Sequence, residues 1–114
     1  MKISKEVKND LIIYKINTFR IDSTNVNDLK DKIVPDIKEG AKILLDLSSV
    51  DYMDSTSLSV LVFFHKEALK KNAKFRIVTN NEKVLSIFIT TGLIRALEIS
   101  KDLTEAINEL SNAT

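Results

Sequence analysis

Apolar side chains recur along the chain in two spacings, one typical of strands and one typical of helices. Residues 3–7 alternate loosely between apolar and polar, and a strongly β-prone run follows at residues 11–16. The pair Asn9 and Asp10, which separates the two runs, is typical of a turn, so we predict a hairpin. Residues 17–24 are polar apart from two apolar side chains and are interpreted as a connection.

Helical spacing of three and four residues appears four times after this connection. The first segment covers residues 26–37, and we expect Pro35 to kink or break it because proline has no backbone donor. The second covers residues 56–71. The third follows the capping pair Asn80-Asn81 and stops at Gly92, and the fourth covers residues 102–110.

Three short apolar runs separate these helices, at residues 43–47, 75–78 and 97–99. The run at 43–47 lacks polar alternation, which is typical of a strand covered on both faces in a mostly parallel sheet. The element order is β-β-α-β-α-β-α-β-α in one domain, residues 1–114. This order predicts an α/β fold: a mixed four- to five-stranded sheet with helices mainly on one face and the first strand at an edge.

Composition narrows the classes of function. The chain has 17 basic and 16 acidic side chains and a net charge of +1, which gives no electrostatic argument for binding nucleic acid or a membrane. It has no cysteine, which suits a cytoplasmic protein. No apolar run approaches the roughly 18 residues that span a bilayer, and the first residues do not resemble a signal peptide.

Few residues suggest catalysis or metal binding. The single histidine, His65, falls on the face of the second predicted helix that we expect to point inward, and it has neither a second ligand nor a nucleophile partner. Asp51 and Asp54 lack a third ligand at suitable spacing and are interpreted as solvated charges. The chain has only two glycines, too few for a phosphate-binding glycine-rich loop. We therefore predict no metal, no cofactor and no enzymatic activity.

The most informative stretch is Asp54-Ser55-Thr56-Ser57-Leu58, at a strand-to-helix junction. The N–H groups of a helix's first turn lack intrahelical acceptors, and the helix dipole makes that end electropositive. A hydroxyl there can cap the helix, or it can carry a phosphate that adds roughly −1.5 to −2 charges. The local pattern leaves both roles open for Ser55, with Thr56 and Ser57 as secondary phosphorylation candidates. Asp54 is either an alternative cap or a neighbour that repels the phosphate.

With the elements placed, two stretches resemble a known family. Residues 45–58, LDLSSVDYMDSTSL, closely resemble the signature of anti-sigma-factor antagonists of the STAS domain family: an apolar strand, an aromatic-Met pair, then Asp-Ser-Ser/Thr-Gly-Leu. Residues 84–93, VLSIFITTGL, are similar to the family's third helix and its Thr-Gly-Leu ending. The element order agrees as well, so the resemblance covers nearly the whole chain and implies a STAS-like fold.

The resemblance also implies a function. Ser55 matches the serine that the family's partner kinase phosphorylates, and Asp22 matches an aspartate in a loop near that serine and the partner interface. We therefore expect an anti-sigma-factor antagonist that binds a serine kinase/anti-sigma factor when unphosphorylated, freeing a sigma factor, and is released on phosphorylation of Ser55. A PP2C-type phosphatase is a further expected partner. The implied partner surface includes Asp22, Ser23, Thr24, Asp54 and Ser57.

Two departures from the family pattern leave an alternative open. Ser57 stands where the family usually has glycine, and Phe19-Arg20 stand where it usually has Gly-Glu. The added side chain at position 57 could change how a partner docks. The alternative function is a non-switching STAS scaffold subunit of a signalling or transporter-associated complex.

Phe63 and Phe64 complete the candidate partner surface. Both are expected to project away from the apolar stripe of the second helix. The predicted stripe comprises Leu58, Leu61, Val62 and Leu69. The two phenylalanines either pack under a neighbouring helix or loop, or form an exposed apolar patch beside Ser55 that suits protein docking. The second interpretation fails if both rings are buried.

Overall fold

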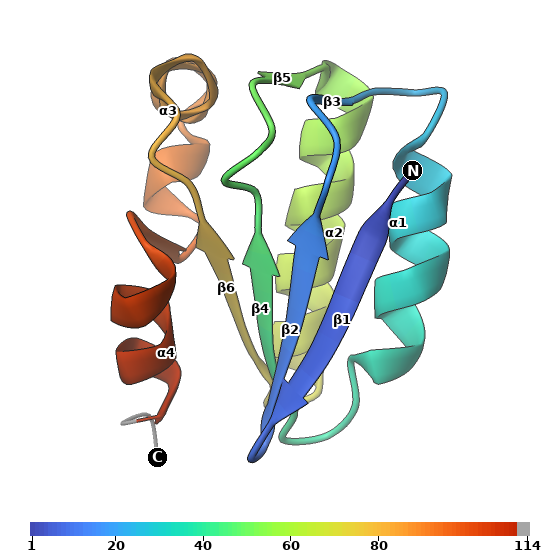
Figure 1. The fold of residues 1–114 in the computed structure, drawn as a ribbon, viewed down its shortest axis with the longest axis vertical. Coiled ribbons are helices and arrows are strands. Elements are labelled where there is room, and N and C mark those ends of the chain that lie inside the picture. The colour runs from blue at the N-terminus through green and yellow to red at the C-terminus, as the bar shows by residue number, and fades with distance from the viewer. Residues whose placement is uncertain (112–114) are drawn as a thin grey trace.

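The computed structural model describes residues 1–111, which form a five-stranded mixed sheet with helices on both faces (Figure 1). The strands, in sheet order, are β1 (Ile3–Lys8), β2 (Leu11–Ile16), β4 (Lys42–Asp46), β6 (Lys74–Val78) and β7 (Ile99–Ser100). The helices are α1 (Val26–Ile33), α2 (Ser55–Lys70), α3 (Glu82–Thr91) and α4 (Leu103–Ser111). This arrangement confirms the predicted α/β class and the mixed sheet.

The first two strands form the expected hairpin, in which Ile3 lies opposite Ile16 and Lys8 opposite Leu11. The turn contains Asn9 at φ 57°, a left-handed conformation that asparagine tolerates better than most residues. The pairs β2–β4, β4–β6 and β6–β7 are parallel. β1 therefore lies at the edge of the sheet, as predicted.

The core is divided by the sheet into two parts of unequal size. Side chains of α1, α2 and α3 join one large buried cluster, whereas α4 covers the opposite face through a small one. The small cluster comprises Leu11, Ile13, Leu44, Val78, Ala106 and Leu110. Leu44 packs in the small cluster while Ile43 and Leu45 pack in the large one, so β4 is buried on both faces, as its continuous apolar run predicts.

Local sequence signals set the helix ends. α1 ends at Ile33, and a 3₁₀ turn at Val34–Asp36 contains Pro35, which confirms the expected break. The Asn81 side chain accepts hydrogen bonds from the N–H groups of Lys83 and Val84 at the start of α3. Gly92 ends α3 at φ 80°, the left-handed conformation of a helix C-cap.

Two expectations about strands need correction. The last strand is β7 at Ile99–Ser100 rather than 97–99, because Leu97 still belongs to the turn after α3, where its N–H bonds to the Leu93 carbonyl at 2.9 Å. The connection at 17–24 contains β3 (Arg20–Ile21), which pairs in parallel with β5 (Tyr52–Met53). Strands of two residues are too short to show an alternating pattern, so this pair could not be predicted from residue spacing.

The buried face of α2 also differs from the predicted stripe. Its buried residues are Ser57, Leu58, Val60, Leu61, Phe64 and Ala68. Leu69 is 65% exposed and Val62 only half-buried, because the helix lies on the sheet along positions 57, 61, 64 and 68. Phe64 is fully buried, its ring 5.8 Å from the ring of Phe75 in β6.

The interpretation of Phe64 as an exposed docking residue is therefore wrong. Phe63 is half-buried and turned toward α1, where the Lys30 ammonium group lies 4.8 Å from its ring centroid. Phe64 forms no exposed patch beside Ser55, and the half-buried ring of Phe63 packs against the large core cluster. Both contribute to packing, which is the other interpretation that the sequence left open.

Phe64→Ala is expected to lower the free energy of unfolding by about 3–5 kcal/mol, since it leaves a cavity between α2 and the sheet. Leu69→Ala on the same helix is the matched control, and at an exposed position it should change stability by less than about 0.5 kcal/mol. Urea denaturation followed by circular dichroism measures both. Equal losses in the two variants would contradict the observed orientation of α2.

Gly92→Ala is expected to cost roughly 1–2 kcal/mol, because residue 92 has a left-handed backbone that a Cβ disfavours. No atom lies within 4 Å of the Cβ that alanine would add, so the cost comes from the backbone rather than from a clash. Gly92→Asn should lose less, since asparagine tolerates this conformation. Thermal melts of both variants provide the measurement, and a more stable alanine variant would refute the assignment.

Candidate functional site

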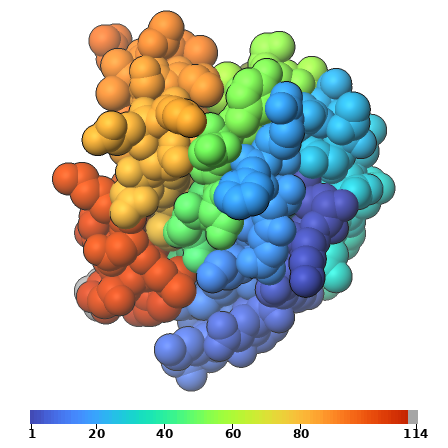
Figure 2. Space-filling view, turned by 45° about the horizontal axis from the view of Figure 1, so that its top comes forward, coloured from blue at the N-terminus to red at the C-terminus, as the bar shows by residue number. Residues whose placement is uncertain are grey.

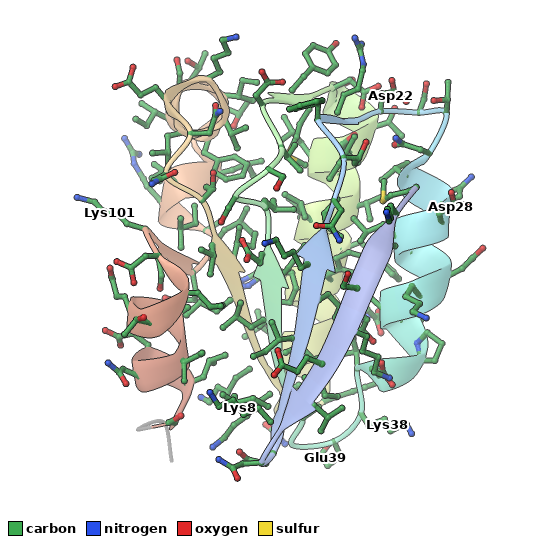
Figure 3. All side chains as sticks on the ribbon, in the orientation of Figure 1. Lys8, Asp22, Asp28, Lys38, Glu39 and Lys101 are labelled. Carbon is green, nitrogen blue, oxygen red and sulfur yellow. The ribbon has the colours of Figure 1, made fainter. Side chains whose placement is uncertain are left out.

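The short β3–β5 pair brings two distant loops together at one end of the sheet. Arg20 lies opposite Tyr52, and Ile21 lies opposite Met53. The Phe19 carbonyl oxygen accepts hydrogen bonds from the N–H groups of Asp51 at 2.8 Å and Tyr52 at 3.2 Å. As a result, the loop that follows β3 lies beside the first turn of α2, at the upper end of the molecule, where Asp22 is labelled (Figure 3).

Asp54 is the N-cap of α2 and joins it to that loop. Its Oδ1 accepts a hydrogen bond from the Ser57 N–H at 2.9 Å, and its Oδ2 accepts one from the Ser23 N–H at 3.0 Å. The hydrogen bond from the Ser57 N–H is the main reason that the pKa of Asp54 lies below its usual value. Of the two residues considered as caps, the structure uses Asp54 and leaves the Ser55 side chain outside this role.

Ser57 is 1% exposed and lies beneath the same junction. Its hydroxyl donates to the Ile21 carbonyl at 2.6 Å, and its Oγ lies 2.8 Å from Asp54 Oδ1. The interpretation of Ser57 as a partner contact or a secondary phosphorylation site is therefore wrong for this structure. Position 57 lies on the sheet-facing side of α2, so its side chain points toward β3 and away from solvent.

Asp22 holds the loop after β3 in shape. Its Oδ1 accepts hydrogen bonds from the hydroxyl and the N–H of Thr24, and its Oδ2 lies 3.2 Å from Arg20 Nε. These bonds, the one from the Thr24 hydroxyl first, lower the pKa of Asp22. The N–H of Asp22 in turn donates to Asn25 Oδ1 at 2.9 Å. Asn25 is the N-cap residue of α1, but its side chain makes no cap hydrogen bond there.

The structure thus places most of the candidate site at one end of the sheet. Ser55 and Thr56 are exposed in the first turn of α2, and Ser23 and Thr24 are exposed in the adjoining loop. The carboxylates of Asp54 and Asp22 both serve as acceptors for N–H groups of this region. A modification of Ser55 would therefore occur at a solvent-accessible position directly after Asp54, whose carboxylate binds the loop that carries Asp22.

Two aromatic residues of this end were not among the predicted site residues. Phe19 is 76% exposed and Tyr52 is 41% exposed. The Arg20 guanidinium carbon lies 4.2 Å from the centroid of the Tyr52 ring, a cation–π arrangement. One sequence signal could have identified Phe19: it is an aromatic side chain in the mostly polar connection at residues 17–24.

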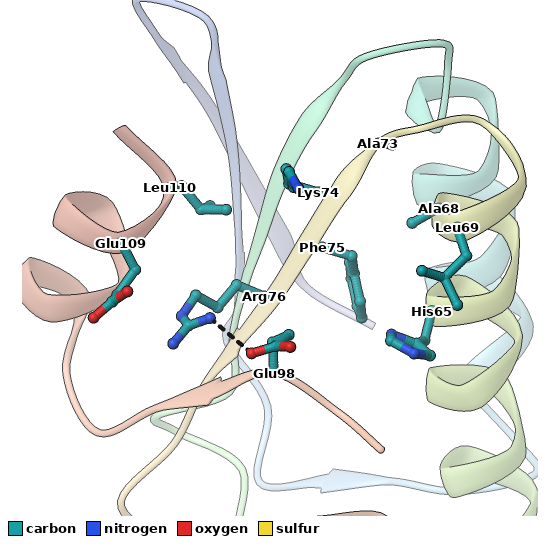
Figure 4. A pocket seen from close by; sticks show the side chains of 10 residues that line it. All are labelled: His65, Ala68, Leu69, Ala73, Lys74, Phe75, Arg76, Glu98, Glu109 and Leu110. Atoms are coloured by element: carbon teal, nitrogen blue, oxygen red, sulfur yellow. Dashed lines mark hydrogen bonds and ion pairs between the residues drawn. The ribbon is translucent and has the colours of Figure 1, made fainter. Parts of the chain in front are cut away.

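A hollow with a volume of about 440 Å³ lies elsewhere, between α2, β6 and α4 (Figure 4). Half-buried His65 lines one wall and Glu109 the opposite one. Between them, the Arg76 guanidinium donates hydrogen bonds to the Glu98 carboxylate at 3.2 Å and to the Ser100 hydroxyl at 2.6 Å. These bonds give Arg76 a structural role. The hollow contains no serine or cysteine beside a base and offers no argument for catalysis.

Within residues 1–111, no three or more histidine, cysteine, aspartate or glutamate side chains gather as a metal site would require. Over the same range, no helix is both long and apolar enough to cross a membrane.

Comparisons with known proteins agree with this geometry. The model of the STAS domain family matches residues 2–106. An anti-sigma-B factor antagonist of Bacillus subtilis (strain 168) is 32% identical over 101 residues, which cover 88% of this chain and 93% of that protein.

Solved structures share the fold. An anti-sigma factor antagonist from Mycobacterium paratuberculosis superposes with a TM-score of 0.87 at 18% identity, covering 97% of this chain and 94% of that one. The anti-sigma factor antagonist SpoIIAA in its unphosphorylated form gives a TM-score of 0.78 at 18% identity, covering 99% of each chain. The phosphorylated form of SpoIIAA, from Bacillus, gives a TM-score of 0.69 at 18% identity, covering 95% of this chain and 98% of that one.

The sequence match extends through the strand-to-helix junction and nearly to the end of the fold, and the fold itself is shared. We conclude that this chain belongs to the STAS domain family, among the anti-sigma factor antagonists, which are regulators rather than enzymes.

Proposed function

We propose that this protein is an anti-sigma factor antagonist that binds a serine kinase/anti-sigma factor and is released when Ser55 is phosphorylated. The observation that carries the proposal is the position of Ser55, exposed in the first turn of α2 directly after the Asp54 cap. Support also comes from the 32% identical anti-sigma-B factor antagonist of Bacillus subtilis.

A phosphate on Ser55 would be tolerated within the isolated domain. Asp54 already caps α2, so modification of the Ser55 hydroxyl removes no cap bond. The first-turn N–H groups and the positive end of the helix dipole favour an added anion. The fold should therefore survive phosphorylation, and its effect should fall on the surface.

The same phosphate would weaken a complex. It brings about two negative charges to a surface that already carries the carboxylates of Asp22 and Asp54. A partner that buries this surface would have to desolvate or pair those charges, and an unpaired buried charge is strongly unfavourable. Release on phosphorylation follows from this cost, without a change of fold. A PP2C-type phosphatase would restore binding, and we place this exchange in the cytoplasm.

The alternative of a non-switching scaffold depended on Ser57 altering the docking surface. Ser57 is buried and bonds to Ile21 and Asp54, so it adds no side chain to that surface. This removes the sequence argument that came from Ser57. The switch therefore remains our proposal.

Ser55→Asp should fold normally but bind the cognate serine kinase at least tenfold more weakly, because the added charge must be desolvated in the complex. Ser55→Ala should bind like the wild type and resist release by ATP. Titration calorimetry against the purified kinase, with thermal melts alongside, measures both effects. Equal affinity for all three proteins would refute the switch.

Phosphorylation by that kinase should occur at Ser55 and not at the neighbouring exposed hydroxyl of Thr56. The Ser55→Ala variant should then take up no phosphate, whereas the matched Thr56→Ala variant should be phosphorylated like the wild type. Phosphopeptide mass spectrometry after incubation with ATP distinguishes the two sites. Phosphorylation of the Ser55→Ala variant would show that the kinase modifies another residue, and it would overturn the assignment.

Asp54→Asn should destabilise the protein near neutral pH, because it replaces the ionised cap that holds α2 and the Ser23 loop together. The pKa of Asp54 is lowered from 3.8 in the folded state, so its charge stabilises the fold above that value. This contribution is lost as the pH falls through the lowered pKa. Urea midpoints of wild type and variant should therefore differ at pH 7 and converge in acid; a constant difference would contradict the role of the charge.

A further inference from the structure

An exposed aromatic side chain stands out at the end of the sheet that carries Ser55. Phe19 is 76% exposed, the largest exposed fraction among the large hydrophobic residues of the described chain. Beside it, the 41% exposed Tyr52 ring stacks with the Arg20 guanidinium at 4.2 Å. Aromatic side chains and arginine are the residues most enriched among the energetic hot spots of protein interfaces.

The backbone at Phe19 and Arg20 is anchored by hydrogen bonds to two other segments. The Phe19 carbonyl oxygen accepts the N–H groups of Asp51 and Tyr52, and the next residue, Arg20, has its carbonyl bonded by Asn25 Nδ2 at 2.9 Å. The ring is therefore presented from an anchored segment. Such a side chain can enter a partner's pocket without the cost of ordering a loop.

The surface around Phe19 is hollowed as well as partly apolar. Asn17, Thr18, Phe19 and Ser49 line a hollow of about 360 Å³. In the space-filling view, the blue surface of the chain near residue 20 lies against the green surface near residue 50 (Figure 2). The charges nearby are already paired, Arg20 with Asp22 at 3.2 Å and Lys83 with Asp51 at 3.8 Å. An apolar centre with a polar rim is the usual anatomy of a protein interface.

This patch is continuous with the Ser55 site. Tyr52 precedes Ser55 by three residues, a chain length of at most about 10 Å. A partner of ordinary size covers about 800 Å² on each protein, enough to include both Ser55 and the Phe19 ring in one footprint. The occupant that these observations favour is therefore the protein that docks at Ser55.

We propose that Phe19 is the anchor through which the serine kinase/anti-sigma factor recognises this protein. The partner would receive the ring in an apolar pocket, with the stacked Arg20–Tyr52 pair at the edge of the contact. This inference rests on the proposed function, since it uses the same partner. It adds the chemistry that the partner must offer, an apolar socket, and the residue of this chain that fills it.

The test is the affinity of full-length variants for the purified serine kinase that phosphorylates this protein, measured by titration calorimetry. Phe19→Ala should weaken binding at least tenfold and leave the thermal midpoint unchanged, since the ring is exposed. Phe19→Leu should recover part of the affinity. Val7→Ala is the matched control, because Val7 is 63% exposed in β1 beside Lys8, at the opposite end of the molecule from Asp22 (Figure 3). It should bind like the wild type.

The outcomes separate this inference from the switch. If Ser55→Asp weakens binding and Phe19→Ala does not, the anchor is refuted and the switch stands. If Phe19→Ala weakens binding and Ser55→Asp does not, the anchor stands and the switch is refuted. Sedimentation velocity adds a third outcome: a dimer of the wild type that Phe19→Ala dissolves, with unchanged kinase affinity, would assign the patch to self-association and overturn the proposal.

Discussion

The geometry of the site depends on one carboxylate, that of Asp54. One of its oxygens caps α2 through the Ser57 N–H, and the other accepts the Ser23 N–H from a loop 31 residues earlier in the chain. Buried Ser57 supports the junction from below through the Ile21 carbonyl. Without these bonds, only the backbone pairing of β3 with β5 would hold the start of α2 beside the loop after β3.

This arrangement separates the structural role of Asp54 and Ser57 from the regulatory role that we propose for Ser55. Asp54 and Ser57 use their polar groups to build the junction, while the Ser55 side chain is left exposed at its surface. A charge added there acts mainly on whatever contacts that surface. The short β3–β5 pair holds the loop after β3 beside the start of α2. It also adds the exposed side chains of Phe19 and Tyr52 to the same surface. Regulation by surface charge then requires no second conformation of the domain.

The sequence predicted those features that depend on local chemistry. Pro35 and Gly92 act through their own backbones, so the break after α1 and the end of α3 could be recognised without the rest of the fold. The orientation of α2 could not, because its apolar residues are spread around the helix and only packing against the sheet selects Phe64 over Leu69. The bond between Asp54 and Ser23, and the burial of Ser57, likewise depend on tertiary contacts that residue spacing does not encode.

The central claim is that a phosphate on Ser55 changes the surface and leaves the fold intact. Comparison of two-dimensional ¹H–¹⁵N NMR spectra of the unmodified and Ser55-phosphorylated protein tests it most directly. We predict shifts confined to residues 19–25 and 51–59, with the amides of β4 and β6 unchanged. Shifts that extend through those central strands, or a loss of amide protection across the sheet, would show that phosphorylation acts on the fold and would contradict the account.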